Sequence, residues 1–243
     1  MIISLCDDPQ DVADLAAQRV AGLLHDSPRA VLGLPTGRTP IVLYDLLAQQ
    51  HAAGQLDFSQ VESFNLDEFV GIGQDHPGSY RSYMQRYLFD RVNLTNGQGH
   101  VLDGLAPDAD AECARFEQLI DAAGGIDLMI LGLGANGHIG FNEPADSLKA
   151  RTHRVTLLES SRAANAGFFG GDPAQVPAEA MTMGMGTILK ARRILLLVTG
   201  AEKAPTVAAM IRGAVTTQLP ASFLQLHDEV EVICDADAAS QIR

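Results

Sequence analysis

Between residues 127 and 144 the chain reads DLMILGLGANGHIGFNEP. The first seven residues are almost continuously apolar, which is typical of a strand buried on both faces of a parallel sheet. The glycine-rich turn that follows would lie at the carboxyl end of this strand, the edge at which open α/β sheets bind ligands. The stretch therefore predicts a parallel sheet with a site on its edge, and His138 and Glu143 are the candidate reactive groups.

The rest of the chain alternates between apolar runs and segments with helical spacing. Strands are expected at 30–34, 61–66, 127–133, 155–158, 194–198 and 230–234, and helices at 9–24, 40–51, 79–89, 109–123, 201–211 and 221–227. This alternation predicts a Rossmann-like α/β fold, with a mostly parallel sheet, helices on both faces and right-handed crossovers. No linker or repeat divides residues 1–243, so a single domain is expected. Residues 163–185 lack a regular pattern and are either a mobile flap over a site or an ordinary loop.

The composition is acidic, with 17 Lys and Arg against 30 Asp and Glu and a net charge of −13. Partners such as nucleic acid or a membrane surface are therefore not expected, because both bind mainly through basic surface. The three cysteines lack metal-ligand spacing, the N-terminus lacks a signal-peptide pattern, and no apolar run approaches the roughly 20 residues that span a bilayer. We expect a cytoplasmic protein with reduced thiols. A monomer and a homo-oligomer fit this pattern equally well.

A second turn, LGLPTGRTP at residues 32–40, leads from a predicted strand into a predicted helix with proline at its first position. Exposed backbone N–H groups at a helix start favour an anion, and Gly37 lets the backbone approach it closely. Thr36 or Thr39 can add a hydroxyl group, and Arg38 a charge-assisted hydrogen bond. The segment is not a Walker loop, because the Gly-Lys-Ser/Thr ending is absent. It is interpreted as a phosphate-binding turn, the alternative being a capped helix start with a surface arginine.

Two adjacent carboxylates, Asp67 and Glu68, follow the strand expected at 61–66. Successive side chains of an extended strand point in opposite directions, so only one of the two can face a given ligand. Asp67 is the candidate base for a proton next to a carbonyl group, and it is ionised at neutral pH unless its surroundings perturb it strongly. The alternatives are a helix cap or surface pair, and an acidic metal ligand.

His138 and Glu143 are five residues apart, and a turn can bring them into contact. Such a pair can shuttle a proton between substrate oxygens while the carboxylate holds the imidazole in the useful tautomer. A core histidine is the alternative. A zinc site lacks support because the chain has neither an HExxH motif nor paired cysteines, and the absence of a Gly-x-Ser-x-Gly elbow disfavours a serine hydrolase.

Four motifs follow one another along the chain: LPTGxTP at 34–40, FNxDEF at 64–69, HPxSY at 76–80 and GxNGHIGFNEP at 134–144. In this order the chain closely resembles the glucosamine-6-phosphate deaminases, over about residues 30–227. The last motif is specific to that family, whereas the related 6-phosphogluconolactonases share the fold but differ after the Gly-His. The resemblance implies conversion of glucosamine 6-phosphate and water to fructose 6-phosphate and ammonia, with no metal or organic cofactor.

The resemblance also implies a role for each matched residue. His138 would promote opening of the pyranose ring, with Glu143 and Asn136 positioning it and completing the proton relay. Asp67 would take the C2 proton and return it at C1, which gives a ketose imine that loses ammonia to water. A proton next to a carbonyl and an ammonium group is acidified, so a positioned carboxylate is a sufficient base.

The chain departs from the family pattern at three positions. Asn136 stands where many members have Asp, although short members resemble this chain in carrying Asn. Gly167 stands where the flap motif Ala-Asn-x-Arg-Phe-Phe has a phosphate-binding arginine, and Arg38 stands where the phosphate turn usually has a small residue. Our hypothesis is that Arg38 replaces the missing arginine and that Lys203, which matches a family phosphate lysine, is the second cation. An arginine at position 38 and none at 167 would also fit a different substrate, such as galactosamine 6-phosphate or another phosphorylated amino sugar.

Two further alternatives come from relatives of the same fold. A lactonase would hydrolyse 6-phosphogluconolactone and release no ammonia. A sugar-phosphate sensor would carry a DNA-binding helix-turn-helix, for which no segment of this sequence is left over. The joint presence of Asp67, His138 and Glu143 favours catalysis over sensing.

Overall fold

A parallel sheet of seven strands forms the centre of the molecule. The computed structural model describes residues 1–95 and 97–242. The strand order is β1-β10-β9-β6-β2-β3-β5, and every neighbouring pair is parallel. The strands are β1 Ile2–Leu5, β2 Val31–Leu34, β3 Glu62–Asn65, β5 Gly99–His100, β6 Leu128–Gly132, β9 Arg193–Val198 and β10 Val230–Cys234. The predicted single-domain α/β fold is confirmed.

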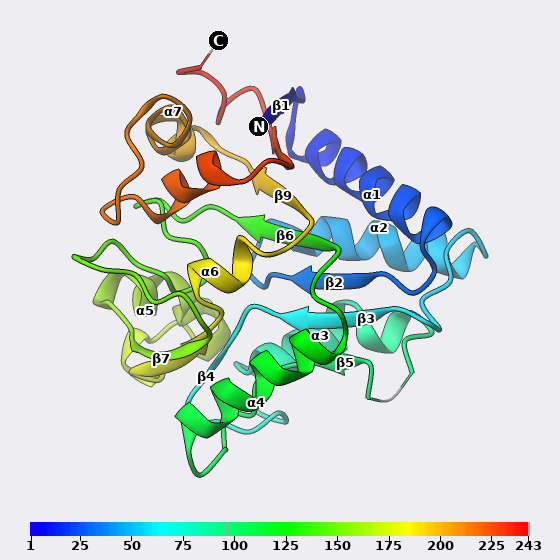
Figure 1. Cartoon of the computed structure of the whole chain (residues 1–243), viewed down its shortest axis with the longest axis vertical. Helices are drawn as coiled ribbons and strands as arrows, with labels where there is room; N and C mark the ends of the chain where they lie inside the picture. Colours follow the sequence, from blue (N-terminus) through cyan, green and yellow to red (C-terminus); the bar gives the residue numbers. More distant parts are fainter. Residues whose placement is uncertain (96, 243) are drawn as a thin grey trace.

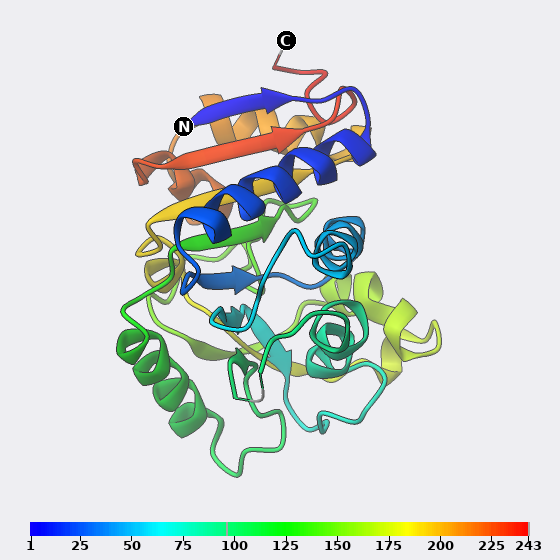
Figure 2. The same ribbon diagram turned by 90° about the vertical axis from the view of Figure 1, so that its right-hand side faces the viewer.

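Helices cover both faces of this sheet (Figure 1, Figure 2). On one face lie α1 (Pro9–Asp26), α2 (Pro40–Ala52) and α3 (Tyr80–Tyr87), and on the other lie α4 (Ala109–Ala122), α6 (Met185–Ile188) and α7 (Ala204–Arg212). Leu128 and Ile130 of β6 pack in the hydrophobic core between the sheet and the helices α1, α2 and α3. Met129 and Leu131 pack in the core on the opposite face, with α4, α6 and α7. Burial on both faces explains why this strand is apolar at every position.

The order in which strands are added to the sheet reverses between β2 and β6. After β2 it adds β3 and β5 on one side, and after β6 it adds β9 and β10 on the other. Because β2 and β6 are parallel neighbours, their carboxyl ends lie side by side at this switch point. Such a crevice is the usual ligand-binding position of open α/β sheets. The two turns singled out in the sequence both start there.

A second, antiparallel sheet of three strands packs beside the carboxyl edge. Its order is β4-β8-β7, with β4 at Asp67–Phe69, β8 at Glu179–Thr182 and β7 at His153–Thr156. The strand expected at 155–158 is therefore β7 and belongs to this sheet, not to the parallel one. The strands β4 and β8 were not expected, because they are short and carry charged residues that interrupt any apolar run.

Residues 163–185 are more regular than their sequence indicates. They include the end of α5 (Glu159–Asn165), two 3₁₀ helices at Ala166–Phe169 and Pro173–Gln175, and all of β8. The last part of this stretch is the central strand of the second sheet, so it is fixed on both sides. A mobile flap stays a prediction, and we confine it to the residues that precede β8.

Smaller differences concern the ends of elements. The helix expected at 201–211 starts as a 3₁₀ helix at Ala201–Lys203 and becomes α7 at Ala204, and the segment expected at 221–227 is a 3₁₀ helix at Pro220–Leu226. A further 3₁₀ turn lies at Phe89–Arg91. None of the described helices is both long and apolar enough to cross a membrane.

Candidate active site

Glycines shape the turn that follows β6. The N–H group of Gly134 donates to the carbonyl oxygen of His138 at 3.0 Å, and Gly137 has a φ of 84°, in the region that favours glycine. A Cβ atom on Gly134 would lie 2.3 Å from the imidazole of His138. The hydroxyl group of Thr206 in α7 donates to Ala135 O at 2.7 Å and holds the turn against that helix. The missing side chain at 134 thus makes room for the imidazole.

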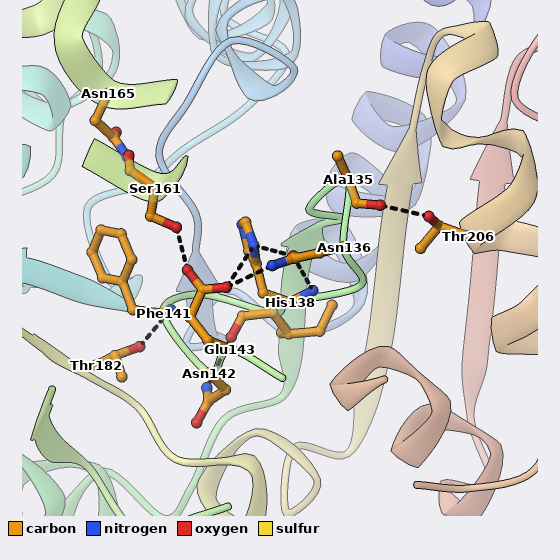
Figure 3. Close-up of polar contacts among 11 residues, drawn as sticks. Ala135, Asn136, His138, Phe141, Asn142, Glu143, Ser161, Asn165, Thr182 and Thr206 are labelled. Atoms are coloured by element: carbon orange, nitrogen blue, oxygen red, sulfur yellow. Dashed lines mark hydrogen bonds and ion pairs between the residues drawn. The ribbon is translucent and has the colours of Figure 1, made fainter. Parts of the chain in front are cut away.

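Asn136 links His138 to Glu143 (Figure 3). Its Oδ1 lies 2.7 Å from Nδ1 of His138 and also accepts the backbone N–H of His138 at 3.2 Å. Its Nδ2 donates to Oε2 of Glu143 at 2.8 Å, and the same Oε2 lies 3.4 Å from Nδ1 of His138. Because both oxygens near Nδ1 are acceptors, the proton of the neutral imidazole belongs on Nδ1. Nε2 then keeps a lone pair that can take a proton from a ligand.

Glu143 is a buried carboxylate whose neighbours favour its ionised form. Only 8% of its surface is exposed, and its second carboxylate oxygen, Oε1, accepts a hydrogen bond from Ser161 Oγ in α5. Burial by itself raises the pKa of this carboxyl group, but the hydrogen bonds from His138, Ser161 and Asn136 outweigh it and lower the pKa to about 2. An anion fixed beside the imidazole stabilises the positive charge that develops when the ring takes up a proton.

Asp67 lies in β4 on the other side of the turn. A Cβ atom on Gly140 would be 3.3 Å from Oδ2 of Asp67 and 2.9 Å from Oγ1 of Thr182, so the turn touches the second sheet at this glycine. Asp67 is 6% exposed and receives no hydrogen bond from any residue that the structure describes. Burial, together with the charge of Glu68, raises its pKa to about 8. The surroundings of Asp67 therefore perturb its pKa strongly, and they favour the protonated carboxyl group at neutral pH.

Glu68 points away from this site and caps α3. It accepts hydrogen bonds from Ser79 Oγ at 2.7 Å and from the N–H groups of Tyr80 and Arg81, each at 3.0 Å. The helix-cap alternative thus applies to Glu68 and not to Asp67. Over residues 1–95 and 97–242, His, Cys, Asp and Glu do not form a group of three or more that is suited to a metal ion.

The turn after β2 lies beside the aromatic side chains of α3. Gly37 has a φ of 111°, and its carbonyl oxygen accepts the hydroxyl proton of Tyr83 at 2.7 Å. The hydroxyl group of Tyr80, which donates to Asn165 Oδ1 at 2.9 Å, lies near the side chain of Thr36. Thr39 begins α2 without a capping hydrogen bond from its side chain, so its hydroxyl group is not used by the helix.

Two cations lie near this edge of the sheet. Arg38 is exposed in the turn after β2, and Lys203 ends the 3₁₀ helix that follows β9, the neighbour of β6. In the part of the chain that the structure describes, neither side chain forms a hydrogen bond or an ion pair. Burial lowers the pKa of Lys203 despite the nearby charge of Glu202. Both cations are therefore available to an anionic ligand.

The structure adds residues that sequence reasoning did not single out. Ser161 reaches Glu143 from α5, and Thr182 Oγ1 accepts the N–H of Phe141 at 3.1 Å from β8 (Figure 3). Both side chains are buried, but serine and threonine are common residues and no local pattern marks either one. Only the packing of α5 and β8 against the turn reveals them.

Comparison with known proteins places the chain in a family. Residues 7–233 match the glucosamine-6-phosphate isomerases/6-phosphogluconolactonase family. The chain belongs to this family. It is 49% identical to a glucosamine-6-phosphate deaminase of Hahella chejuensis, over 100% of this chain and 92% of that protein. It is 45% identical to glucosamine-6-phosphate deaminase 2 of Bacillus subtilis, over 100% of this chain and 98% of that protein.

Solved structures of the family agree with the fold. A monomeric glucosamine-6-phosphate deaminase superposes with a TM-score of 0.96 at 42% identity, covering 99% of this chain and 100% of that one. A 6-phosphogluconolactonase from Trypanosoma cruzi gives a TM-score of 0.79 at 21% identity, covering 99% of this chain and 96% of that one. The second likeness shows the fold alone.

The turn geometry gives a first prediction for this family member. In Gly134→Ala, the added Cβ must displace the His138 ring by about 1 Å to restore a normal contact. We expect ¹⁵N NMR of the imidazole to show the Nδ1-protonated tautomer in the unmodified protein and its loss in the variant. Gly132→Ala is the matched control, because a Cβ there meets nothing within 4 Å. An unchanged His138 signal in Gly134→Ala would contradict this description of the turn.

Proposed function

We propose that this chain is a glucosamine-6-phosphate deaminase, which converts glucosamine 6-phosphate and water into fructose 6-phosphate and ammonia. The observation that carries the proposal is the contact at Gly140 between the His138 turn and Asp67, since it joins a proton relay to a buried carboxyl group. The full-length relatives at 44–49% identity carry the same name. A phosphorylated sugar does not cross a membrane unaided, and we place the reaction in the cytoplasm.

The first step opens the pyranose ring. Nε2 of His138 takes the proton of the C1 hydroxyl group and delivers a proton to the ring oxygen, so the C1–O5 bond breaks and C1 becomes an aldehyde. Asn136 Oδ1 keeps the imidazole proton on Nδ1 throughout. The carboxylate of Glu143 stabilises the imidazolium that exists between the two transfers.

The second step moves the carbon-bound proton. C2 lies between the aldehyde and the ammonium group. Asp67 takes the C2 proton and a proton of the ammonium group passes to O1, which gives an enol amine. Asp67 returns the proton to C1, which leaves a hydroxymethyl group at C1 and an imine at C2. Water adds to this imine carbon, and the C2–N bond breaks to release ammonia and form the ketone of fructose 6-phosphate.

The raised pKa of Asp67 fits this role. Before the substrate binds, burial favours the protonated carboxyl group, with a pKa of about 8. The ammonium group of the substrate brings a positive charge next to Asp67, which favours the ionised form and lowers its pKa in the complex. The substrate thereby creates its own base, and a base with a pKa near the working pH transfers protons efficiently in both directions.

A coupled assay tests the proposal. The protein is expected to form ammonia and fructose 6-phosphate in equal amounts from glucosamine 6-phosphate. Asp67→Asn keeps the shape of the side chain but removes the base, so kcat should fall about 10²- to 10⁴-fold. Galactosamine 6-phosphate and 6-phosphogluconolactone are run in parallel. Ammonia from galactosamine 6-phosphate alone, or hydrolysis of the lactone alone, would contradict the proposed substrate.

We propose further that Arg38 binds the substrate phosphate in place of an arginine at position 167. Gly167 is exposed, and a Cβ on it would meet nothing within 4 Å. Its neighbour Phe168 packs edge-on against Tyr83 at 6.0 Å between ring centroids, and Tyr83 in turn holds Gly37. Position 167 therefore lies beside the phosphate turn, where a cation on either segment can reach the same anion. Lys203 supplies the second positive charge.

An exchange of the two positions tests this assignment. Arg38→Gly removes a charge-assisted contact and should raise KM for the sugar phosphate about 10- to 100-fold with a much smaller change in kcat. Adding Gly167→Arg to that variant should recover most of the lost KM. Arg29→Gly is the control, because it makes the same charge change at the amino end of β2. Equal KM values for Arg38→Gly and Arg29→Gly would refute the phosphate role of Arg38.

A further inference from the structure

We infer that Ser161 is a positioning residue, whose hydroxyl group holds the carboxylate of Glu143 in the orientation that serves His138. The inference rests on the proposed deaminase function, because it assigns Ser161 to the relay of that reaction. Ser161 does not face the substrate in this assignment, and it acts only through Glu143.

The geometry at Glu143 carries the inference. The two oxygens of its carboxylate are bound from opposite sides by different segments (Figure 3). Oε2 belongs to the turn, where it accepts from Asn136 and lies 3.4 Å from His138. Oε1 belongs to α5, where the hydroxyl group of Ser161 donates to it. A carboxylate held at both oxygens cannot rotate about its last bond without losing a partner.

Because Glu143 is buried, its oxygen Oε1 depends on the hydroxyl group of Ser161 for a hydrogen bond. Ser161 is 3% exposed and Glu143 is 8% exposed, so water has little access to the carboxylate. A buried charge that loses a hydrogen bond is strongly destabilised unless it moves or takes up a proton. Without the hydroxyl group, Glu143 is expected to do both, and each weakens its contact with His138.

The helix that carries Ser161 is anchored without this hydroxyl group. Asn165 Nδ2 donates to the backbone oxygen of Ser161 at 2.9 Å, and Asn165 Oδ1 accepts the hydroxyl proton of Tyr80 at 2.9 Å. Arg162 donates to Val176 O at 3.1 Å. A substitution at the Ser161 side chain therefore changes the contact with Glu143 and leaves α5 in place.

The experiment compares three single variants of the full chain. Ser161→Ala removes the donor, Ser161→Thr keeps it, and Ser160→Ala makes the same deletion at the adjacent, exposed position. We expect kcat of Ser161→Ala to fall about 10-fold. This is smaller than the whole contribution of a general acid–base group, about 10²- to 10⁴-fold, because the relay is weakened and not removed. KM should change less than about 2-fold, since Ser161 does not bind substrate. Ser161→Thr and Ser160→Ala should resemble the unmodified enzyme.

The pH dependence separates positioning from a general structural effect. The pKa of Glu143 is about 2 with all three donors in place, so losing one raises it. The ratio of kcat in Ser161→Ala to kcat in Ser160→Ala should accordingly decrease as the pH is lowered, because the ionisation of Asp67 affects both variants alike and cancels in the ratio. Equal losses in Ser161→Ala and Ser161→Thr, or a fall in kcat with a ratio that does not change with pH, would overturn the positioning role.

A second measurement does not depend on turnover. A ¹³C NMR titration of the Glu143 carboxyl group should show a higher pKa in Ser161→Ala than in Ser160→Ala. If the unmodified protein releases no ammonia from glucosamine 6-phosphate, the proposed function fails, whereas an unmoved Glu143 titration refutes the Ser161 contact itself. Activity in the unmodified protein with identical titrations in the two variants overturns only the inference about Ser161.

Discussion

Two buried carboxyl groups in one site are held in opposite electrostatic surroundings. Asp67 has no hydrogen-bond donor among the described residues, and burial raises its pKa to about 8. Glu143 is also buried, but three donors hold its pKa at about 2. Separation of pKa values by environment lets one site contain a permanent anion and a group that exchanges a proton near neutral pH. The proposed reaction needs both, one to support His138 and one to move a proton between two carbons.

The fold maintains this contrast by building each environment from a different sheet. In the parallel sheet, the central strand β6 leads into the turn that carries Asn136 and His138, at the switch point. The antiparallel sheet presents Asp67 from β4, and its pairing with Thr182 of β8 keeps the carboxyl group out of water. The two sheets meet at Gly140, where no side chain fits. The backbone of the turn therefore lies directly against the side chains of Thr182 and Asp67, and this close approach sets the position of Asp67 relative to the turn that carries His138.

The sequence predicts the five inner strands of the parallel sheet, because these are largely buried and contain apolar runs. It misses the two edge strands, since β1 is largely exposed and β5 has only two residues. Strands β2, β3, β6, β9 and β10 all follow such runs. It does not predict β4 and β8, since Asp67 and Glu68 occupy most of one and the stability of both comes from pairing across distant segments. Family motifs point to the residues proposed for catalysis, but no pattern indicates that Asp67 lacks a donor or that Ser161 reaches Glu143. These properties depend on packing between α5, β8 and the turn.

The most direct test of this account is a ¹³C NMR titration of the side-chain carboxyl groups in the ligand-free protein, with Asp67→Asn and Glu143→Gln used for assignment. Asp67 is expected to titrate at about 8, while Glu143 is expected to remain ionised through most of the acid range, with a pKa of about 2. An Asp67 signal that titrates near the ordinary aspartate value of about 4 would contradict it, because the site would then lack the dry environment from which the base role is argued.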